Sequence, residues 1–214
     1  MDDLFGHEAL PAREVLSEGA VWLRGRALAD EAGLLAAITG LLRAAPARRM
    51  LTPGGRAMSV GISNCGGLGW ISDRRGYRYA GADPASGRPW PAMPEALVRL
   101  ATLAADEAGF ADFHPDACLI NCYVPGAGVS LHQDRNERDM TQPIVSVSLG
   151  LPAIFLFGGM SRSDRPLRLP LRHGDVLVWG GPDRLRFHGV HPVAPGRHPL
   201  LGSLRVNLTF RRAG

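Results

Sequence analysis

Three side chains in the second half of the sequence are of types that bind transition metals. His132 and Asp134 are separated by a single residue, and His188 follows much later. Alternate residues of a β-strand share a face, so we expect His132 and Asp134 to project together from one strand end, with Gln133 pointing away. Two imidazoles and one carboxylate bind one face of an iron(II) ion and leave positions open for a co-substrate and dioxygen. A structural zinc site would instead be closed by four protein ligands.

The third ligand has to come from four downstream histidines. Two of them, His173 and His198, lie in a tight turn and in a loop rich in proline and glycine. His188 follows residues 185–187, which we expect to form a short strand, and precedes a glycine. We therefore assign His188 as the ligand, with His191 as the weaker choice. The alternative is a set of unrelated surface histidines.

A group of polar residues alternates along one predicted strand near the C-terminus. Its members are Arg205, Asn207, Thr209 and Arg211, and the residues between them are Val206, Leu208 and Phe210. One face of this strand is therefore polar and the other apolar. Two inward guanidinium groups need an anion, because burial of an unpaired charge is costly.

The anion that suits this strand is a carboxylate, which arginine binds through two parallel hydrogen bonds. A dicarboxylate with a keto group fits, because its keto end would bind iron while its far carboxylate meets an arginine. Asn121 and Tyr123 alternate on another predicted strand and would complete the socket by hydrogen bonds. The alternative is a solvated edge strand with ordinary arginines.

The elements that position these residues are mainly short strands. Pro/Gly turns separate six apolar runs, which are 118–124, 144–149, 153–157, 167–171, 175–179 and 204–210. This rhythm predicts an antiparallel jelly roll. Helical spacing is found over 28–45 and 94–108, a strand is expected over 19–24, and short strands and turns over 51–90. We expect an α+β, mainly β, single domain over 1–214, in which an N-terminal region to about residue 115 packs onto the β core.

Composition is that of a globular protein, with 45% hydrophobic and 21% charged residues. No apolar stretch reaches the roughly 20 residues that a membrane span needs. The start, Met1-Asp2-Asp3, is acidic where a secretory signal would be basic, so we expect a cytoplasmic protein with no membrane partner. Cys65, Cys118 and Cys122 form no CxxC pair. Cys118 and Cys122 flank an apolar run and are expected to be buried thiols, with metal ligation as the alternative.

Positive charge is concentrated in the last quarter of the chain. Residues 159–214 carry ten arginines against three acidic residues, whereas residues 1–158 carry 14 against 17. A basic region of this kind suits a nucleic acid. The alternative is a composition bias, because the chain contains no lysine.

Seven motifs, in order along the chain, resemble those of the AlkB family of alkylated-DNA-repair dioxygenases. They are Asn121-Cys122-Tyr123, Leu131-His132-Gln133-Asp134, the run 143–152, His173-Gly174-Asp175, Trp179-Gly180-Gly181, His188-Gly189 and the run 205–211. The resemblance extends from about Asn64 to Arg211. It implies a double-stranded β-helix core and a nucleotide-recognition lid.

The resemblance also implies the chemistry. It places iron(II) on His132, Asp134 and His188 and adds Arg211 to the catalytic residues. 2-Oxoglutarate would be bound by residues of two strands, which are Asn121, Cys122, Tyr123, Arg205, Val206, Asn207, Leu208, Thr209, Phe210 and Arg211. With dioxygen, such enzymes oxidise N-alkyl groups on bases such as 1-methyladenine and 3-methylcytosine, and release formaldehyde, succinate and CO2.

Substrate contacts are implied for a lid over residues 64–79. Trp70 would stack on a flipped base, with His132 on the other face of that base. Tyr77, Arg78 and Tyr79 would contact phosphates, and Arg162 would add a contact from a later loop. The alternative for Trp70 and Tyr77 is ordinary core packing.

Asn136 departs from the family pattern, which has an acidic residue at this position. An amide still accepts a hydrogen bond but lacks the charge that favours a cationic base. Glu137 or Asp139 would be the substitute. We expect a monomer acting on alkylated DNA, in single strands. RNA or tRNA bases, a protein hydroxylase and a catalytically silent binder of alkylated nucleic acid are the alternatives.

Overall fold

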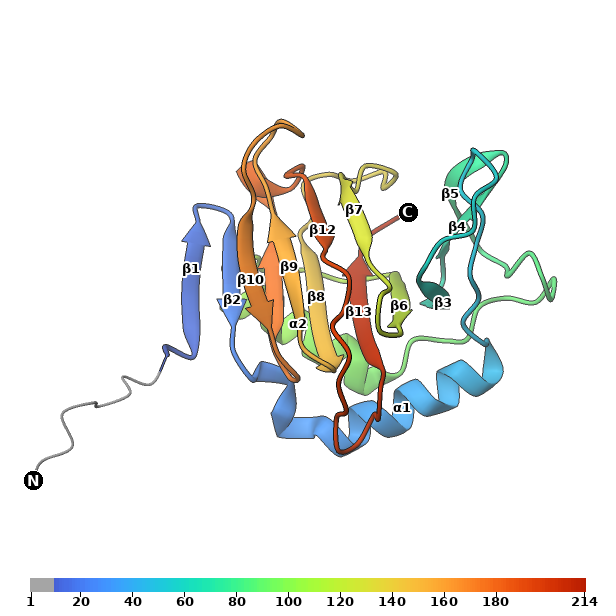
Figure 1. Ribbon diagram of the computed structural model, residues 1–214, viewed down its shortest axis with the longest axis horizontal. Helices are drawn as coiled ribbons and strands as arrows, with labels where there is room; N and C mark the ends of the chain where they lie inside the picture. Colours follow the sequence, from blue (N-terminus) through green and yellow to red (C-terminus); the bar gives the residue numbers. More distant parts are fainter. Residues whose placement is uncertain (1–9) are drawn as a thin grey trace, which may run out of the picture.

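Two antiparallel sheets face each other in the computed structural model, which describes residues 10–214 (Figure 1). The seven-stranded sheet has the order β1 (Arg13–Ser17), β2 (Ala20–Leu23), β11 (Val176–Trp179), β8 (Ile144–Gly150), β13 (Arg205–Arg211), β6 (Ala117–Tyr123) and β3 (Gly61–Gly66). The four-stranded sheet has the order β10 (Leu167–Leu171), β9 (Ala153–Phe157), β12 (His188–Val190) and β7 (Val129–His132). A separate hairpin consists of β4 (Gly69–Asp73) and β5 (Gly76–Ala80).

Each face of the seven-stranded sheet has its own apolar core. One core lies between the two sheets and includes Phe155, Phe157 and Trp179. The other lies under the helices and includes Val206, Leu208 and Phe210 from alternate positions of β13, which fits the two-residue period of a strand. The sheets and their cores thus form the predicted jelly roll.

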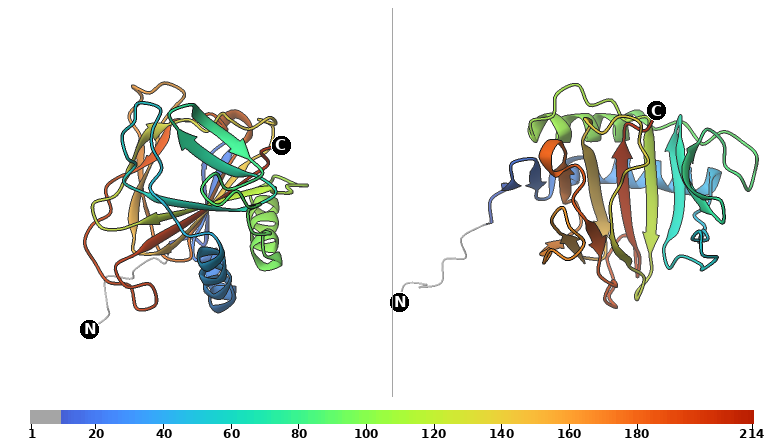
Figure 2. Two further views of the ribbon diagram at one scale, coloured as in Figure 1. Left: turned by 90° about the vertical axis from the view of Figure 1, so that its right-hand side faces the viewer. Right: turned by 90° about the horizontal axis from the view of Figure 1, so that it is seen from above.

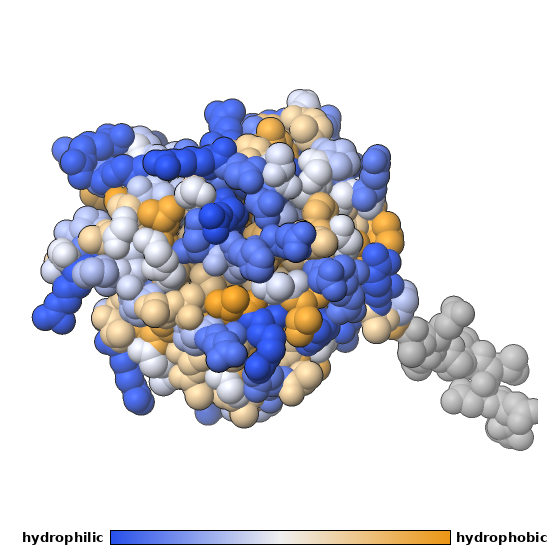
Figure 3. All heavy atoms as spheres, turned by 180° about the vertical axis from the view of Figure 1, so that it is seen from behind, coloured by the Kyte–Doolittle hydropathy of each residue, from blue (hydrophilic) through white to orange (hydrophobic). Residues whose placement is uncertain are grey.

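The two α-helices lie along one side of the β structure (Figure 2). α1 (Glu31–Ala44) follows a short 3-10 helix, η1 (Arg26–Asp30), and buries Leu34, Ile38 and Leu41 at helical spacing. α2 (Glu95–Glu107) begins after Pro94, whose fixed φ suits a helix start. Seen from behind, hydrophobic side chains on this face are scattered among hydrophilic ones (Figure 3). No helix within residues 10–214 is long and apolar enough to cross a membrane.

The predicted elements are found with small shifts. All six strands predicted after residue 118 are present to within one residue, and the predicted strand over 19–24 is β2. The region 51–90 contains β3, β4 and β5, as expected. The helix predicted from residue 28 begins at Glu31, because the first turn is the 3-10 helix. The sequence also predicts an extended segment before residue 19, and its first part, residues 1–9, lies outside the described residues.

Two strands and one connection differ from the prediction. β1 and β12 were not predicted, and residues 185–187 are not a strand, whereas the strand end expected at His132 is that of β7. Gly181–Asp183 forms the 3-10 helix η2, and Arg186 donates its amide to the Asp183 carbonyl, so this segment turns instead of extending. The region before residue 115 also does more than pack on the core, because β1, β2 and β3 are strands of the large sheet.

Candidate metal centre and anion socket

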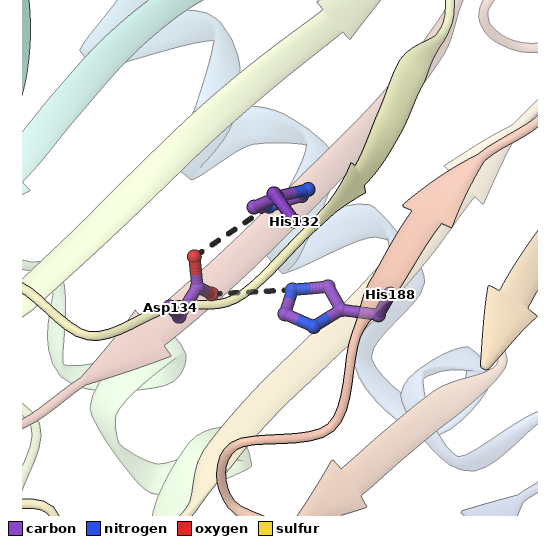
Figure 4. Close-up of side chains that lie close together, drawn as sticks. All are labelled: His132, Asp134 and His188. Atoms are coloured by element: carbon purple, nitrogen blue, oxygen red, sulfur yellow. Dashed lines mark ion pairs between the residues drawn. The ribbon is translucent and has the colours of Figure 1, made fainter. Parts of the chain in front are cut away.

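Two short strands of the small sheet bring the predicted metal ligands together. His132 is the last residue of β7 and His188 the first of β12, and the two are paired in register. Asp134 follows β7 by two residues and turns back between them (Figure 4). Its Oδ1 lies 3.6 Å from His132 Nε2 and its Oδ2 lies 3.4 Å from His188 Nε2. One ligand atom from each residue can be chosen so that all lie within 4.8 Å of one another.

The two imidazoles are oriented by main-chain carbonyls. His132 Nδ1 is 2.9 Å from the Ser130 carbonyl oxygen, and His188 Nδ1 is 3.0 Å from the Arg186 carbonyl oxygen. Such a carbonyl fixes the proton on Nδ1, which leaves the Nε2 lone pair for a metal. The donor set therefore fits an iron(II) ion with three protein ligands.

The protonation behaviour of the ligands follows from burial and charge. Burial, together with the nearby His132, lowers the pKa of His188 and favours its neutral, ligating form. Burial alone would raise the pKa of Asp134, but the charges of Arg211 and His188 hold it well below its usual value. Burial alone would lower the pKa of His132, but the hydrogen bond to Asp134 and the negative charge of Asp134 raise that pKa above its usual value.

The predicted anion socket lies on the inner face of β13 and its two neighbours. In the pairing of β13 with β6, Arg205 is opposite Tyr123 and Asn207 is opposite Asn121. Asn121 Nδ2 lies 3.4 Å from Asn207 Oδ1 and 3.3 Å from Thr209 Oγ1. The polar and apolar faces of this strand are thus as predicted.

Arg205 has the geometry expected of a residue that binds an anion. Its side chain is fully enclosed, and its guanidinium lies over the Tyr123 ring. Nη2 donates to Ser148 Oγ at 3.0 Å, whereas Nε and Nη1 are buried without a hydrogen-bond partner. Unpartnered buried donors of a cation are costly, so the socket fits the far carboxylate of 2-oxoglutarate.

Four residues of the predicted cofactor set need correction. Val206, Leu208 and Phe210 belong to the core under the helices, and Cys122 packs against that core. They occupy the alternate positions of β13 and β6, so their side chains face away from the cavity. The implied motif was continuous in sequence, but only every second side chain can line the socket.

Sequence reasoning missed two hydroxyl groups of the socket. Ser146 and Ser148 on β8 are buried, and they accept hydrogen bonds from Asn207 Nδ2 at 2.8 Å and from Arg205, respectively. The signal was present in the alternation of Ser with Val and Leu along the run 144–149. Gln133 was expected to point away from the metal ligands. Its Nε2 donates to the Leu185 carbonyl at 2.6 Å, but the residue also lines the cavity next to those ligands.

A cavity of about 310 Å³ joins the metal ligands to part of the lid. Trp70 and Tyr77 line it from the hairpin, with ring centroids 5.4 Å apart and planes inclined by 15°. Asn136 and His132 line the same cavity. Tyr77 is 46% exposed, so its ring is open to solvent, whereas Trp70 is half-buried and also packs against the core between the two sheets. The structure thus brings four predicted substrate or ligand residues to one place.

Three other predicted substrate residues lie outside this cavity. Arg78 donates to both oxygens of Asp73, at 3.0 and 2.7 Å. Tyr79 was predicted to contact phosphate, which needs correction, because its hydroxyl donates to Glu137 at 2.7 Å beneath the cavity. Arg162 is exposed on the loop after β9, with its guanidinium 5.5 Å from the Phe187 ring centroid.

The substitutes suggested for an acid at Asn136 can also be placed. Glu137 is buried and its oxygens are engaged by Tyr79 and Arg184. Asp139 is half-buried and accepts hydrogen bonds from Thr141. Neither residue lines the cavity, so neither takes the place of an acidic side chain at position 136.

Comparisons with known proteins agree with this geometry. A family model described as the 2OG-Fe(II) oxygenase superfamily matches residues 19–211. Alpha-ketoglutarate-dependent dioxygenase AlkB of Escherichia coli is 54% identical over 214 residues, covering 100% of this chain and 99% of that protein. The tRNA demethylase abh1 of Schizosaccharomyces pombe is 32% identical over 133 residues, covering 62% and 44%. The solved structure of OsALKBH1 matches with a TM-score of 0.79 and 28% identity, covering 94% and 99%.

These findings confirm the reaction class that the ligand triad and the socket predicted. The enzyme is a dioxygenase that uses iron(II), 2-oxoglutarate and dioxygen. Its fold is the jelly roll common to such enzymes. The chain belongs to the 2OG-Fe(II) oxygenase superfamily and, within it, to the AlkB family.

Proposed function

We propose that this dioxygenase removes N-alkyl groups from bases in DNA, of the 1-methyladenine and 3-methylcytosine type. The observation that carries the proposal is the stacked Trp70–Tyr77 pair, which opens into the same cavity as the iron ligands. A flat aromatic platform beside an oxidising centre suits a planar base. The full-length similarity to AlkB supports the same substrate class.

Each part of the site has a distinct task in this reaction. His132, Asp134 and His188 would hold iron(II), while Arg205, Asn121 and Tyr123 would hold the far carboxylate of 2-oxoglutarate. With both bound, dioxygen can oxidise the N-alkyl carbon, which leaves as formaldehyde while succinate and CO2 are released. The lid must accept a base that has left its stack, because the alkyl group cannot otherwise reach the cavity.

Turnover on a methylated oligonucleotide tests the proposal. Incubation with iron(II), ascorbate and 2-oxoglutarate should restore the unmodified base and release formaldehyde and succinate in equal amounts. The unmethylated oligonucleotide is the control. His132→Ala should lose turnover but keep oligonucleotide binding, which separates an enzyme from a silent binder. Intact iron binding without base-dependent turnover would contradict the proposal.

The same chemistry on RNA is the second candidate, favoured by the similarity to a protein named as a tRNA demethylase. Matched DNA and RNA oligonucleotides with one methylated base distinguish the two, since a higher kcat/KM on RNA would favour this candidate. Our proposal also includes a monomeric, cytoplasmic enzyme that prefers single strands. Faster repair of duplex than of single-stranded DNA would contradict that preference.

A further inference from the structure

A cluster of four charged side chains includes one of the iron ligands, and only two of the four line the cavity. Asp134 and Arg211 belong to the site already described. Glu137 and Arg184 do not line the cavity, and their side chains are only 1% and 3% exposed. Charged groups are rarely buried to this extent unless they are paired.

Arg184 holds three groups of the ligand loop at once. Its Nη1 donates to the Asp134 carbonyl at 2.8 Å, and its Nε donates to the Gln142 carbonyl at 2.9 Å. Its Nη2 forms an ion pair with Glu137 Oε2 at 3.1 Å. The main chain of the metal ligand is therefore fixed by a cation whose counterion is Glu137.

Glu137 also meets the lid and the second arginine. Its Oε1 accepts from the Tyr79 hydroxyl at 2.7 Å and lies 3.4 Å from Arg211 Nη1. Arg211 Nη1 donates to the same hydroxyl at 2.8 Å, and Arg211 Nη2 contacts the Asp134 carboxylate. Tyr79 is on β5, so this network connects the hairpin to the metal ligand.

We propose that Glu137 is a positioning residue for the iron centre. Its negative charge balances Arg184 and Arg211, so that both arginines can hold Asp134 without making the site repel a divalent cation. With Glu137 the buried cluster has two positive and two negative charges, and without it one positive charge is left in excess. Because Glu137 is outside the cavity, this role is independent of which base is repaired.

The proposal predicts opposite effects on the metal and on the co-substrate. Glu137→Gln removes the charge and keeps the shape, so the excess positive charge should weaken binding of a dication. Loss of an outer-shell partner typically costs about 10- to 100-fold in metal affinity. The same excess charge should leave binding of dianionic 2-oxoglutarate unchanged or tighter, which a general loosening of the fold would not do.

Cobalt(II) binding, followed by its visible absorption without DNA or 2-oxoglutarate, is the test. Glu137→Gln should raise the cobalt Kd by about 10- to 100-fold, while the 2-oxoglutarate Kd at saturating cobalt does not rise. Glu137→Asp, which keeps the charge, should rescue most of the loss. Asp139→Asn removes one charge from a half-buried position of the same loop, outside the cavity, and should change neither Kd.

Three results would overturn the proposal. They are an unchanged cobalt Kd in Glu137→Gln, parallel losses of both affinities, or an equal loss in Glu137→Asp. If Glu137→Gln does not fold, the double variant Glu137→Gln/Arg184→Gln is used instead, since it removes one charge of each sign and restores the balance of the cluster. A cobalt Kd raised as much as the proposal expects for Glu137→Gln alone would also overturn the proposal. No measurement involves a nucleic acid, so this proposal and the proposed substrate can fail separately.

Discussion

Arg205 shows most clearly how single residues define the co-substrate. It is buried beside Tyr123 and Ser148, and two of its nitrogens have no partner among the described residues. Burial lowers the pKa of Arg205, and the neighbouring Tyr123 offsets only part of this effect. A cation kept in this state destabilises the free protein and is compensated when an anion binds.

Arg205→Met should therefore separate stability from binding. A buried, poorly partnered charge can be replaced by an apolar group at little cost or with a gain, so unfolding without ligand should occur at an equal or higher temperature. The KM for 2-oxoglutarate should rise about 10- to 100-fold, as expected for loss of charge-assisted hydrogen bonds. Thermal unfolding with and without 2-oxoglutarate, and steady-state kinetics, measure both. Arg168→Met, an exposed arginine of β10, is the control and should change neither.

Asn136 lines the cavity, at the position where the family resemblance leads us to expect an acidic residue. Asn136→Asp should add a negative charge near the base and favour cationic 1-methyladenine over neutral 1-methylguanine. An electrostatic gain on the order of 1 kcal/mol would raise the ratio of the two kcat/KM values about fivefold. Competition between the two lesions in one oligonucleotide pool measures this ratio. A ratio equal to that of the wild type would show that position 136 does not sense the charge of the base.

Among single residues, the sequence predicted those site residues that lie close together along the chain and share a strand face. His132, Asp134 and the alternating face of β13 follow from the two-residue period of strands. Glu137 and Arg184 could not be recognised, because they are far apart in sequence and resemble surface residues in their context. Their role depends on the turn that carries Arg184 under the ligand loop.

Among the elements, the β4–β5 hairpin has a distinct position. It is a separate two-stranded sheet and is attached to β3 by Asn64, whose amide bonds both the NH and the carbonyl of Trp70 at 3.0 Å. Trp90 Nε1 adds a bond to the Ala80 carbonyl at 2.9 Å. A Cβ at Gly69 would collide with Trp90 and Asn64, so the close approach requires glycine there.

Asn64→Leu should loosen this hairpin and leave the co-substrate socket on β13 in place. Both Trp70 main-chain groups would lose their partner, which costs about 1–3 kcal/mol for each buried group. The KM for the oligonucleotide should rise while the KM for 2-oxoglutarate stays constant. Hydrogen exchange of residues 69–80 should accelerate relative to that of β13. Equal increases in both KM values would contradict a local role.

Element prediction succeeded for long apolar runs and failed for short strands. β12 is brief and contains a polar ligand, so its sequence lacks an apolar pattern, although it holds His188. β1 is an exposed edge strand with little burial to mark it. Such strands exist because neighbouring strands pair with them, and pairing is not visible in the local sequence.

For the whole molecule, a partly buried ion pair connects the loop after the hairpin to the segment before β3. Arg48 Nη1 donates to Asp83 Oδ2 at 2.9 Å, and Asp83 is 4% exposed. The Arg48 hydrogen bond, opposed by burial, lowers the pKa of Asp83 to about 2. This carboxylate is thus stabilised as an anion in the folded state.

Stability should depend on this pair in acid. The pKa of Asp83 is lower in the folded state than in the unfolded state. The ion pair therefore contributes its full share to the free energy of unfolding above the unfolded pKa of about 4, and this contribution is lost as the pH falls toward the folded pKa. At neutral pH Asp83→Asn should cost about 1–2 kcal/mol, and the difference from wild type should shrink between roughly pH 4 and pH 2. Urea unfolding across this range measures it. Exposed Asp106→Asn is the control and should show no such pH-dependent difference.

The separation of the hairpin from the two large sheets has a consequence for heat inactivation. The co-substrate socket lies on β13, at the centre of the seven-stranded sheet, whereas the base platform depends on an appended hairpin. Weakly attached segments open before central strands do. On warming, recognition of damage should therefore fail first, and the enzyme should continue to consume 2-oxoglutarate and oxygen without repair. Its upper working temperature would then be set by futile oxidation, well below the temperature at which the jelly roll unfolds.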